Sequence, residues 1–271
     1  MRLLIFVWAV SFLPQTVQAM EVVRGVFRQG GFMVGHTQPT DKVAFNGAPV
    51  PVGRSGLFVI GFERHEKAEA DVKITHVDGT SESQSWIIEP RTYEVQHVTG
   101  VAPKHVNPDP KEMKWIAADT RKIDAARDVF ADLPYVKSTF AWPVSATISG
   151  VYGSARTFNG EERSWHKGLD IAAPKGAVVH APADGVVRLA LPNSFFNGNM
   201  VILDHGHQFY TYYAHLDSIA VKNGQLVRTG DVMGKVGATG RATGPHLHWG
   251  VYWRKIALDP MLLMTEGGKT E

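Results

Sequence analysis

Between residues 20 and 101, short apolar or alternating runs are separated by turn residues. The runs with strand character are residues 25–31, 43–45, 56–62 and 70–75. Asn46-Gly47 and Asp78-Gly79 follow two of these runs, and such dipeptides are typical of tight hairpins. Regularly spaced short strands with turns of this kind predict a β-sandwich-like N-terminal domain over residues 20–101.

The apolar spacing changes to a helical period between residues 109 and 133. Asp109 can cap a helix there, Pro110 suits its first turn, and Glu112 completes a capping box. The expected apolar stripe consists of Met113, Ile116, Thr120, Ile123 and Phe130. We expect this stripe to dock onto a domain in preference to forming a coiled coil. Together with the proline-rich segment before it, the helix makes residues 102–134 a linker and connector helix.

Short strands and glycine turns return in the second half of the chain. Runs such as residues 186–190 and 200–203 alternate with turns such as Asn197-Gly198. They predict an antiparallel β domain without an evident helix over residues 135–265, and then a polar tail over residues 266–271. The predicted fold class is therefore mainly β, with an N-terminal β-sandwich-like domain, a connector helix and a C-terminal antiparallel β domain.

The first 19 residues have the plan of a secretory signal peptide. Arg2 precedes an apolar run over residues 3–13, and small residues lead to a cleavage site after Ala19. The run is shorter than the roughly 20 residues that span a bilayer, although an uncleaved anchor is the alternative. We expect an exported protein, periplasmic or cell-wall associated, with no stable membrane span after cleavage.

Composition limits the chemistry that the chain can use. It has no cysteine among its 271 residues, so any metal site must be built from histidine and carboxylate. Its 28 Lys and Arg residues nearly balance its 26 Asp and Glu residues. A net charge of +2 gives no argument for binding nucleic acid, and we expect none.

A small set of histidines carries the strongest chemical signal. His246 and His248 lie two residues apart in an alternating run, so both imidazoles should face one side of a strand. Upstream lie His166, Asp170 and His215, each in a glycine- or apolar-flanked motif. A catalytic zinc centre uses three protein ligands and leaves one position open. The set therefore predicts a metal-dependent hydrolase with spare histidines for proton transfer.

Other histidines have a different setting. His205 and His207 also lie two residues apart, but Gly206 and the polar context indicate a hairpin turn. We expect both to be structural or at the rim of a site. His180 is expected to find a local hydrogen-bond partner.

These motifs resemble those of the lysostaphin/LytM-type zinc metallopeptidases, over roughly residues 140–260. The matching elements, in the family's order, are His166-x-x-x-Asp170, Tyr213-Ala214-His215-Leu216 and His246-x-His248. The resemblance implies a small antiparallel β metallopeptidase domain with its site in a groove. It implies one zinc ion per chain, with His166, Asp170 and His248 as ligands. It also implies that His215 and His246 are catalytic histidines that do not bind the metal, with their division of labour open.

The same resemblance implies the substrate. Members of the family hydrolyse peptide bonds in the peptidoglycan of bacterial cell walls, so we expect stem peptides as partners. A D-alanyl–diaminopimelate crosslink is favoured over a glycine bridge. The alternatives are a catalytically silent wall-binding activator of other hydrolases and a lipoyl- or biotinyl-like adaptor. Both leave the intact set of five site residues unexplained.

The N-terminal domain shows no reactive cluster in its sequence. We expect it to position or restrain the catalytic domain, by binding wall glycan, binding a wall-associated protein partner, or covering the groove. Positioning is favoured over covering, because only scattered histidines, carboxylates or amides could reach the metal.

Overall fold

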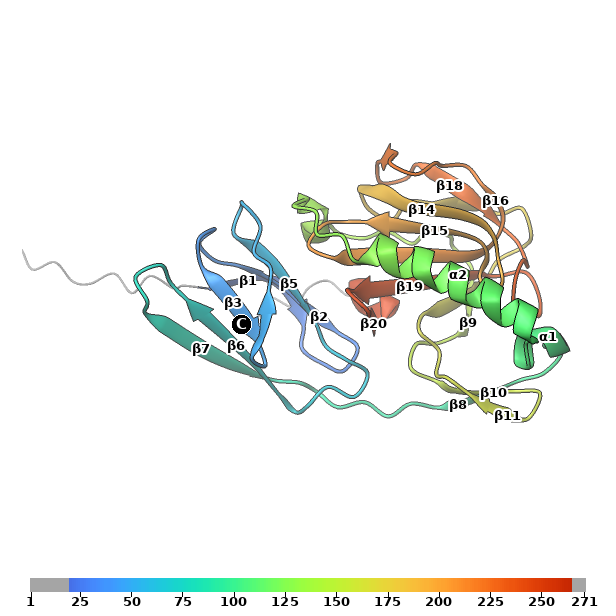
Figure 1. The fold of residues 1–271 in the computed structure, drawn as a ribbon, viewed down its shortest axis with the longest axis horizontal. Coiled ribbons are helices and arrows are strands. Elements are labelled where there is room, and N and C mark those ends of the chain that lie inside the picture. The colour runs from blue at the N-terminus through green and yellow to red at the C-terminus, as the bar shows by residue number, and fades with distance from the viewer. Residues whose placement is uncertain (1–19, 265–271) are drawn as a thin grey trace, which may run out of the picture.

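The computed structural model describes residues 20–264. The predicted signal peptide, residues 1–19, and the predicted polar tail, residues 266–271, lie outside the described residues. Within residues 20–264, no helix is both long and apolar enough to cross a membrane. Figure 1 shows a strand-rich N-terminal part beside a larger C-terminal part, which α2 (Pro110–Arg127) crosses. The predicted mainly β, antiparallel fold class is confirmed.

Two antiparallel sheets build the N-terminal part. One sheet has the order β1-β2-β5 and consists of β1 (Glu21–Val26), β2 (Phe32–His36) and β5 (Leu57–Gly61). The other has the order β4-β3-β6-β7 and consists of β3 (Lys42–Phe45), β4 (Ala48–Val50), β6 (Glu69–Thr75) and β7 (Ser81–Ile87). The rings of Phe45 in β3 and Phe62 after β5 lie 6.0 Å apart between centroids. The two sheets therefore share an apolar core.

Local turn chemistry accounts for the hairpins. Asn46 and Gly47 join β3 to β4 with φ angles of 46° and 82°, and two positive φ angles are what a type I′ turn requires. The prediction of a strand over residues 25–31 was partly wrong. β1 ends at Val26, and Gly30 adopts a φ of 81° in the turn that leads to β2.

The connector contains two helices, α1 (Pro103–Val106) and α2. The predicted capping box is present, because the Asp109 side chain accepts from the Glu112 amide at 2.7 Å and the Glu112 side chain accepts from the Asp109 amide at 2.9 Å. The predicted end near residue 133 was wrong. The helix stops at Arg127, and the 3-10 helix η1 (Pro134–Lys137) follows.

The predicted apolar stripe was also partly wrong. Met113 and Phe130 are exposed, whereas Asp119 and Ala126 are buried. The Asp119 carboxylate accepts the Phe195 amide at 2.8 Å, so a polar residue anchors α2 to the C-terminal part. The helix α2 is therefore docked onto a domain, which was favoured over a coiled coil.

The C-terminal part is organised around a large antiparallel sheet. Its main path, β17-β14-β15-β16-β19-β12-β9, consists of β9 (Thr147–Gly150), β12 (Leu169–Ala172), β14 (Gly185–Ser194), β15 (Gly198–Asp204), β16 (Phe209–Ile219), β17 (Leu226–Val227) and β19 (Leu247–Trp253). Beside this path lie β13 (Val178–His180), β18 (Val232–Val236) and β20 (Ile256–Leu258). The 3-10 helix η2 (Pro260–Leu263) corrects the expectation of no helix in this region.

A small third sheet connects the two parts. After leaving the sandwich, the chain runs as an extended segment to β8 (Val95–Val98), which lies beside β10 (Ala155–Phe158) and β11 (Glu161–Arg163) (Figure 1). β8 and β10 are parallel, with Gln96 opposite Arg156. A strand from the first hundred residues thus joins the C-terminal part, although the N-terminal domain was predicted to extend to residue 101.

Aromatic contacts fix the sandwich against the large sheet. The ring of Phe32 lies 5.6 Å from that of Phe209, and the ring of Phe45 lies 6.5 Å from that of Trp253. Phe209 begins β16 and Trp253 ends β19, so the sandwich docks at one end of these paired strands. His248 lies five residues earlier on β19, which is about 17 Å away at the usual rise of a strand.

Candidate metal centre

Asp170 lies at the centre of the site. It sits on β12, between Gly150 of β9 and His248 of β19, and its side chain is almost fully buried. Its Oδ1 atom is 3.0 Å from His166 Nε2 and 2.9 Å from His248 Nδ1. The two histidine nitrogens are 3.1 Å apart. Three candidate ligand atoms therefore form a nearly equilateral triangle.

This triangle fits a tetrahedral metal ion. The ligand atoms of His166, Asp170 and His248 all lie within 4.8 Å of one another. Zinc with bonds of about 2.0–2.1 Å needs ligand atoms about 3.3 Å apart, which is close to the spacing seen here. Two imidazoles and one carboxylate are also a donor set that zinc accepts, and three protein ligands leave one position for a water or substrate.

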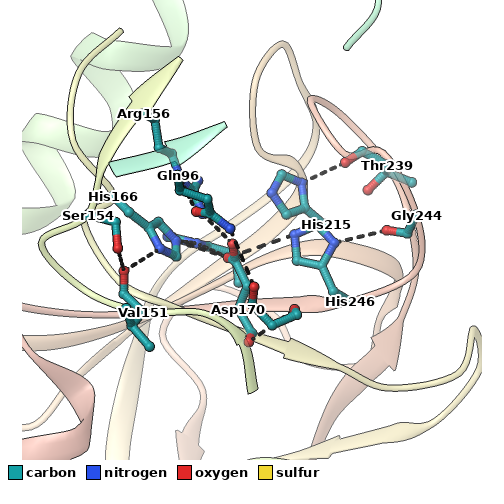
Figure 2. A network of polar contacts seen from close by, with 12 residues as sticks. Gln96, Val151, Ser154, Arg156, His166, Asp170, His215, Thr239, Gly244 and His246 are labelled. Atoms are coloured by element: carbon teal, nitrogen blue, oxygen red, sulfur yellow. Dashed lines mark hydrogen bonds and ion pairs between the residues drawn. The ribbon is translucent and has the colours of Figure 1, made fainter. Parts of the chain in front are cut away.

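The tautomer of His166 suits a metal ligand. Its Nδ1 donates a hydrogen bond to the carbonyl of Val151 at 3.0 Å, so in the neutral ring the proton lies on Nδ1 and Nε2 carries the lone pair. Figure 2 shows the Nε2 side of this ring facing Asp170. The backbone therefore fixes both the ring orientation and the atom offered to a metal.

The pKa values of Asp170 and His248 are shifted in the directions that suit metal binding. Burial alone raises the pKa of Asp170, but hydrogen bonds and charges from His166 and His248 hold that pKa well below its usual range. Burial lowers the pKa of His248, against the opposing effect of Asp170. An ionised carboxylate beside a neutral imidazole is the protonation state that binds metal ions.

A second layer of contacts supports Asp170 from the opposite side. Arg156 Nη2 donates to Asp170 Oδ2 at 2.6 Å, and Arg156 Nε donates to Gln96 Oε1 at 2.9 Å. Figure 2 shows this chain of side chains leading from β8 through β10 to Asp170. Sequence reasoning missed Gln96 and Arg156, because their meeting depends on the parallel pairing of β8 with β10.

His215 and His246 lie beside the triangle, with ring centroids 4.7 Å apart. His215 Nδ1 donates to the Thr239 carbonyl at 2.8 Å, and His246 Nδ1 donates to the Gly244 carbonyl at 2.9 Å (Figure 2). Each ring therefore keeps the lone pair of Nε2 available. His246 Nε2 is 3.8 Å from Asp170 Oδ1, so His246 and His248 face one site, as their spacing predicted.

A change of pairing partner positions His215. β16 pairs with β19 as far as Ala214 and pairs with β18 from Leu216 onward. His215 lies at this junction with a φ of 63°, which is uncommon for a residue with a side chain. Burial lowers the pKa of His215 to about 3, and the charges of His246 and His248 act in the same direction. The imidazole is therefore neutral at physiological pH.

The five side chains open onto a groove of about 550 Å³. Its lining includes Gln96 and Val98 from β8 and the segment from Arg241 to Pro245. Among the described residues, none from 20 to 95 lines this groove. The groove expected from the family resemblance is thus present, and the sandwich itself stays outside it.

The remaining candidate histidines have structural roles. His205 is buried between the Asp184 carbonyl at 2.7 Å and Thr211 Oγ1 at 2.8 Å, and burial lowers its pKa to about 4. His207 is buried near Asp132, with its Nε2 atom 3.6 Å from a carboxylate oxygen. His180 donates from Nδ1 to the Gly230 carbonyl at 2.8 Å. None of these three belongs to the metal-ligand group found among the described residues.

Comparison with known proteins agrees with this geometry. Residues 164–260 match peptidase family M23. Peptidoglycan DD-endopeptidase ShyB of Vibrio cholerae is 44% identical over 96 residues, which are 35% of this chain and 22% of that protein. DD-carboxypeptidase/endopeptidase Mpg of Neisseria meningitidis is 46% identical over 84 residues, which are 31% of this chain and 19% of that protein.

A crystal structure from Pseudomonas aeruginosa, assigned to peptidase M23, is similar over a longer stretch. It is 29% identical, with a TM-score of 0.68, and the match covers 89% of this chain and 96% of that one. The chain spans only about a fifth of the length of the curated relatives that it matches. The match of residues 164–260 to peptidase family M23 confirms the predicted resemblance.

Proposed function

We propose that this protein is an exported zinc-dependent endopeptidase that hydrolyses peptide crosslinks of bacterial peptidoglycan. The observation that carries the proposal is the convergence of His166, Asp170 and His248 on an open groove, with His215 and His246 beside them. Relatives named peptidoglycan DD-endopeptidases support the substrate class. A periplasmic or cell-wall location follows from that substrate and agrees with the predicted signal peptide.

In the proposed mechanism, His166 Nε2, Asp170 Oδ1 and His248 Nδ1 would hold one zinc ion per chain. Zinc, when bound, supplies Lewis acidity to the scissile carbonyl and to the attacking water. We assign His215 and His246 jointly to proton transfer and oxyanion stabilisation, because each is held by a carbonyl at Nδ1 and offers Nε2. An imidazole that has taken the water's proton can pass it to the leaving amine.

Arg156 has a supporting role in this proposal. Its guanidinium holds Asp170 Oδ2, which leaves Oδ1 facing the ligand atoms of His166 and His248, where it could bind the metal with them. Outer contacts of this kind orient a metal ligand and fix its charge.

A catalytically silent wall-binding activator is the alternative function. It gives no reason for keeping His215 and His246 next to a complete ligand triangle. The test is digestion of purified crosslinked muropeptides, followed by mass spectrometry of the products. We expect crosslinked species to become uncrosslinked peptides with a new free amine, at a D-alanyl–diaminopimelate bond. Unchanged muropeptides in the presence of fully zinc-loaded protein would favour the activator.

A further inference from the structure

The groove beside the metal centre has an excess of positive charge. Among its described lining residues, Arg156, Arg163, Lys167 and Arg241 are basic, whereas Asp170 is the acidic residue. A zinc ion at the proposed site would add further positive charge. A groove of this kind attracts anionic ligands and raises their local concentration.

Two of these arginines already have carboxylate partners. Arg156 binds Asp170 and Gln96, as described above. Arg163 binds Glu161 Oε2 at 2.5 Å. Their charges are therefore largely compensated within the protein.

Arg241 is different. Within residues 20–264 its guanidinium forms no ion pair and donates no hydrogen bond to a protein group. It lies between two aromatic rings, 4.7 Å from the centroid of Phe158 and 4.4 Å from that of Phe196. Stacking on both rings fixes the guanidinium while leaving its N–H groups unused.

The surroundings of Arg241 disfavour an isolated charge. Burial lowers its pKa to about 10, and the charges of Arg156 and Arg163 act in the same direction. The side chain still carries its charge at neutral pH, so its compensation must come from a ligand or from solvent. A planar, preoriented guanidinium is suited to bidentate binding of a carboxylate.

We propose that Arg241 anchors a carboxylate-binding subsite in the groove, so that the preferred substrate is an acidic peptide. The subsite rests on the proposed endopeptidase function and names a substrate feature for it. Diaminopimelate carries a carboxylate that a glycine bridge lacks, so the subsite would favour the former crosslink.

Two soluble peptides test this subsite. Both contain the same D-alanyl–diaminopimelate bond, but the free side-chain carboxylate of diaminopimelate is a carboxamide in the second. We expect kcat/KM to be about tenfold or more higher for the carboxylate peptide, as for a hydrogen-bonded charge pair. In Arg241→Gln this preference should disappear, because the KM for the carboxylate peptide should rise to that for the carboxamide peptide.

Two further variants separate recognition from structure. Arg241→Lys retains the charge without the planar fork and should keep part of the preference. Arg121→Gln removes an equal charge from the exposed face of α2 and should keep the full preference for the carboxylate peptide. A purely structural Arg241 would instead give an equal loss for both peptides in Arg241→Gln, and that result overturns the subsite.

The subsite and the endopeptidase activity can fail separately. If the parental protein cleaves both peptides with the same kcat/KM, the proposed subsite is overturned. The proposed endopeptidase activity is not affected by that result. If neither peptide is cleaved, the proposed function fails, and equilibrium binding of both peptides to the metal-free protein decides the subsite alone. The subsite is supported if the parental protein binds the carboxylate peptide more tightly than the carboxamide peptide and Arg241→Gln loses this difference. Equal binding of the two peptides by the parental protein contradicts it.

Discussion

At the residue scale, the Asp170 carboxylate is divided between two sets of partners. Its Oδ1 atom faces His166 and His248, and its Oδ2 atom faces Arg156 at 2.6 Å. The sequence predicted Asp170 and the histidines as site residues, because histidine, aspartate and glycine lie close together in short motifs. It could not identify Arg156, whose role depends on β8 pairing with β10 from a distant part of the chain.

We predict that Arg156→Gln weakens zinc binding by about 10- to 100-fold, the usual cost of losing an outer-shell partner. The substitution leaves Asp170 Oδ2 buried without its charged partner and lets the carboxylate rotate. We expect this loss of orientation to outweigh the removal of a nearby positive charge. Competition with a chromogenic chelator measures the affinity, with Arg121→Gln as the control. Parental affinity in Arg156→Gln would show that Arg156 does not support the metal site.

At the scale of elements, local signals were predictable and distant pairings were not. Asn46-Gly47 specifies its own hairpin, and Asp109 with Glu112 specifies the start of α2. The buried face of α2 was harder to predict, because the buried Asp119 has its hydrogen-bond donor, the Phe195 amide, in a distant part of the chain. The bend that places His215 likewise depends on β16 changing its partner from β19 to β18.

A polar cluster in the sandwich makes an element-scale prediction for pH. Burial raises the pKa of Asp41, but hydrogen bonds from Thr37 and His76 lower it overall. The hydrogen bond with Asp41, at 3.0 Å, raises the pKa of His76. The stability from Asp41 is present above its ordinary pKa of 3.8 and is lost as the pH falls. The stability from His76 is present below its ordinary pKa of 6.5 and is lost as the pH rises through the elevated value.

The cluster therefore stabilises the sandwich most between these two limits. We predict that His76→Ala lowers Tm clearly near pH 5.5 and much less near pH 9. Thermal unfolding followed by circular dichroism at both values measures the difference. The exposed His65, which forms no bond to a carboxylate among residues 20–264, provides His65→Ala as the matched control. An equal loss of Tm at both pH values would mean that the His76–Asp41 charge pair contributes nothing.

At the scale of the whole molecule, two of the contacts between the N-terminal part and the C-terminal part bear most on the site. The sandwich docks through Phe32 and Phe45 at the end of β16 and β19 that lies away from the site. β8 instead reaches the groove, where Gln96 contacts Arg156. These contacts favour the predicted positioning role of the N-terminal domain over a covering role, because residues 20–95 do not line the groove. They also place β8, which follows the sandwich in the chain, in the lining of the groove.

Two truncated chains separate these contributions. One begins at Glu94 and keeps β8, and the other begins at Ala102 and lacks it. Both expose the apolar surface around Phe209 and Trp253, so their losses of stability should be similar. We predict that the Glu94 chain cleaves a small soluble peptide at about the parental rate, and that the Ala102 chain is slower and holds zinc less tightly.

Several outcomes would contradict this view of the N-terminal part. Faster peptide cleavage by the Glu94 chain than by the full protein would mean that the sandwich restrains the site. Equal activity and zinc affinity in both truncated chains would mean that β8 is not needed to build the groove. A positioning role predicts that the Glu94 chain acts more weakly than the full protein on intact sacculi, but cleaves the small peptide equally well.

Zinc content and turnover, measured together in four proteins, test the central claim most directly. The parental protein should hold about one zinc ion per chain and cleave crosslinked muropeptides. His248→Ala should lose most of the zinc and the activity, because one of three ligands is gone. His215→Ala and His246→Ala should keep the zinc and lose about a hundredfold or more in rate, as expected for acid–base residues. Full zinc occupancy in His248→Ala, or near-parental cleavage by either of the other two variants, would contradict the account.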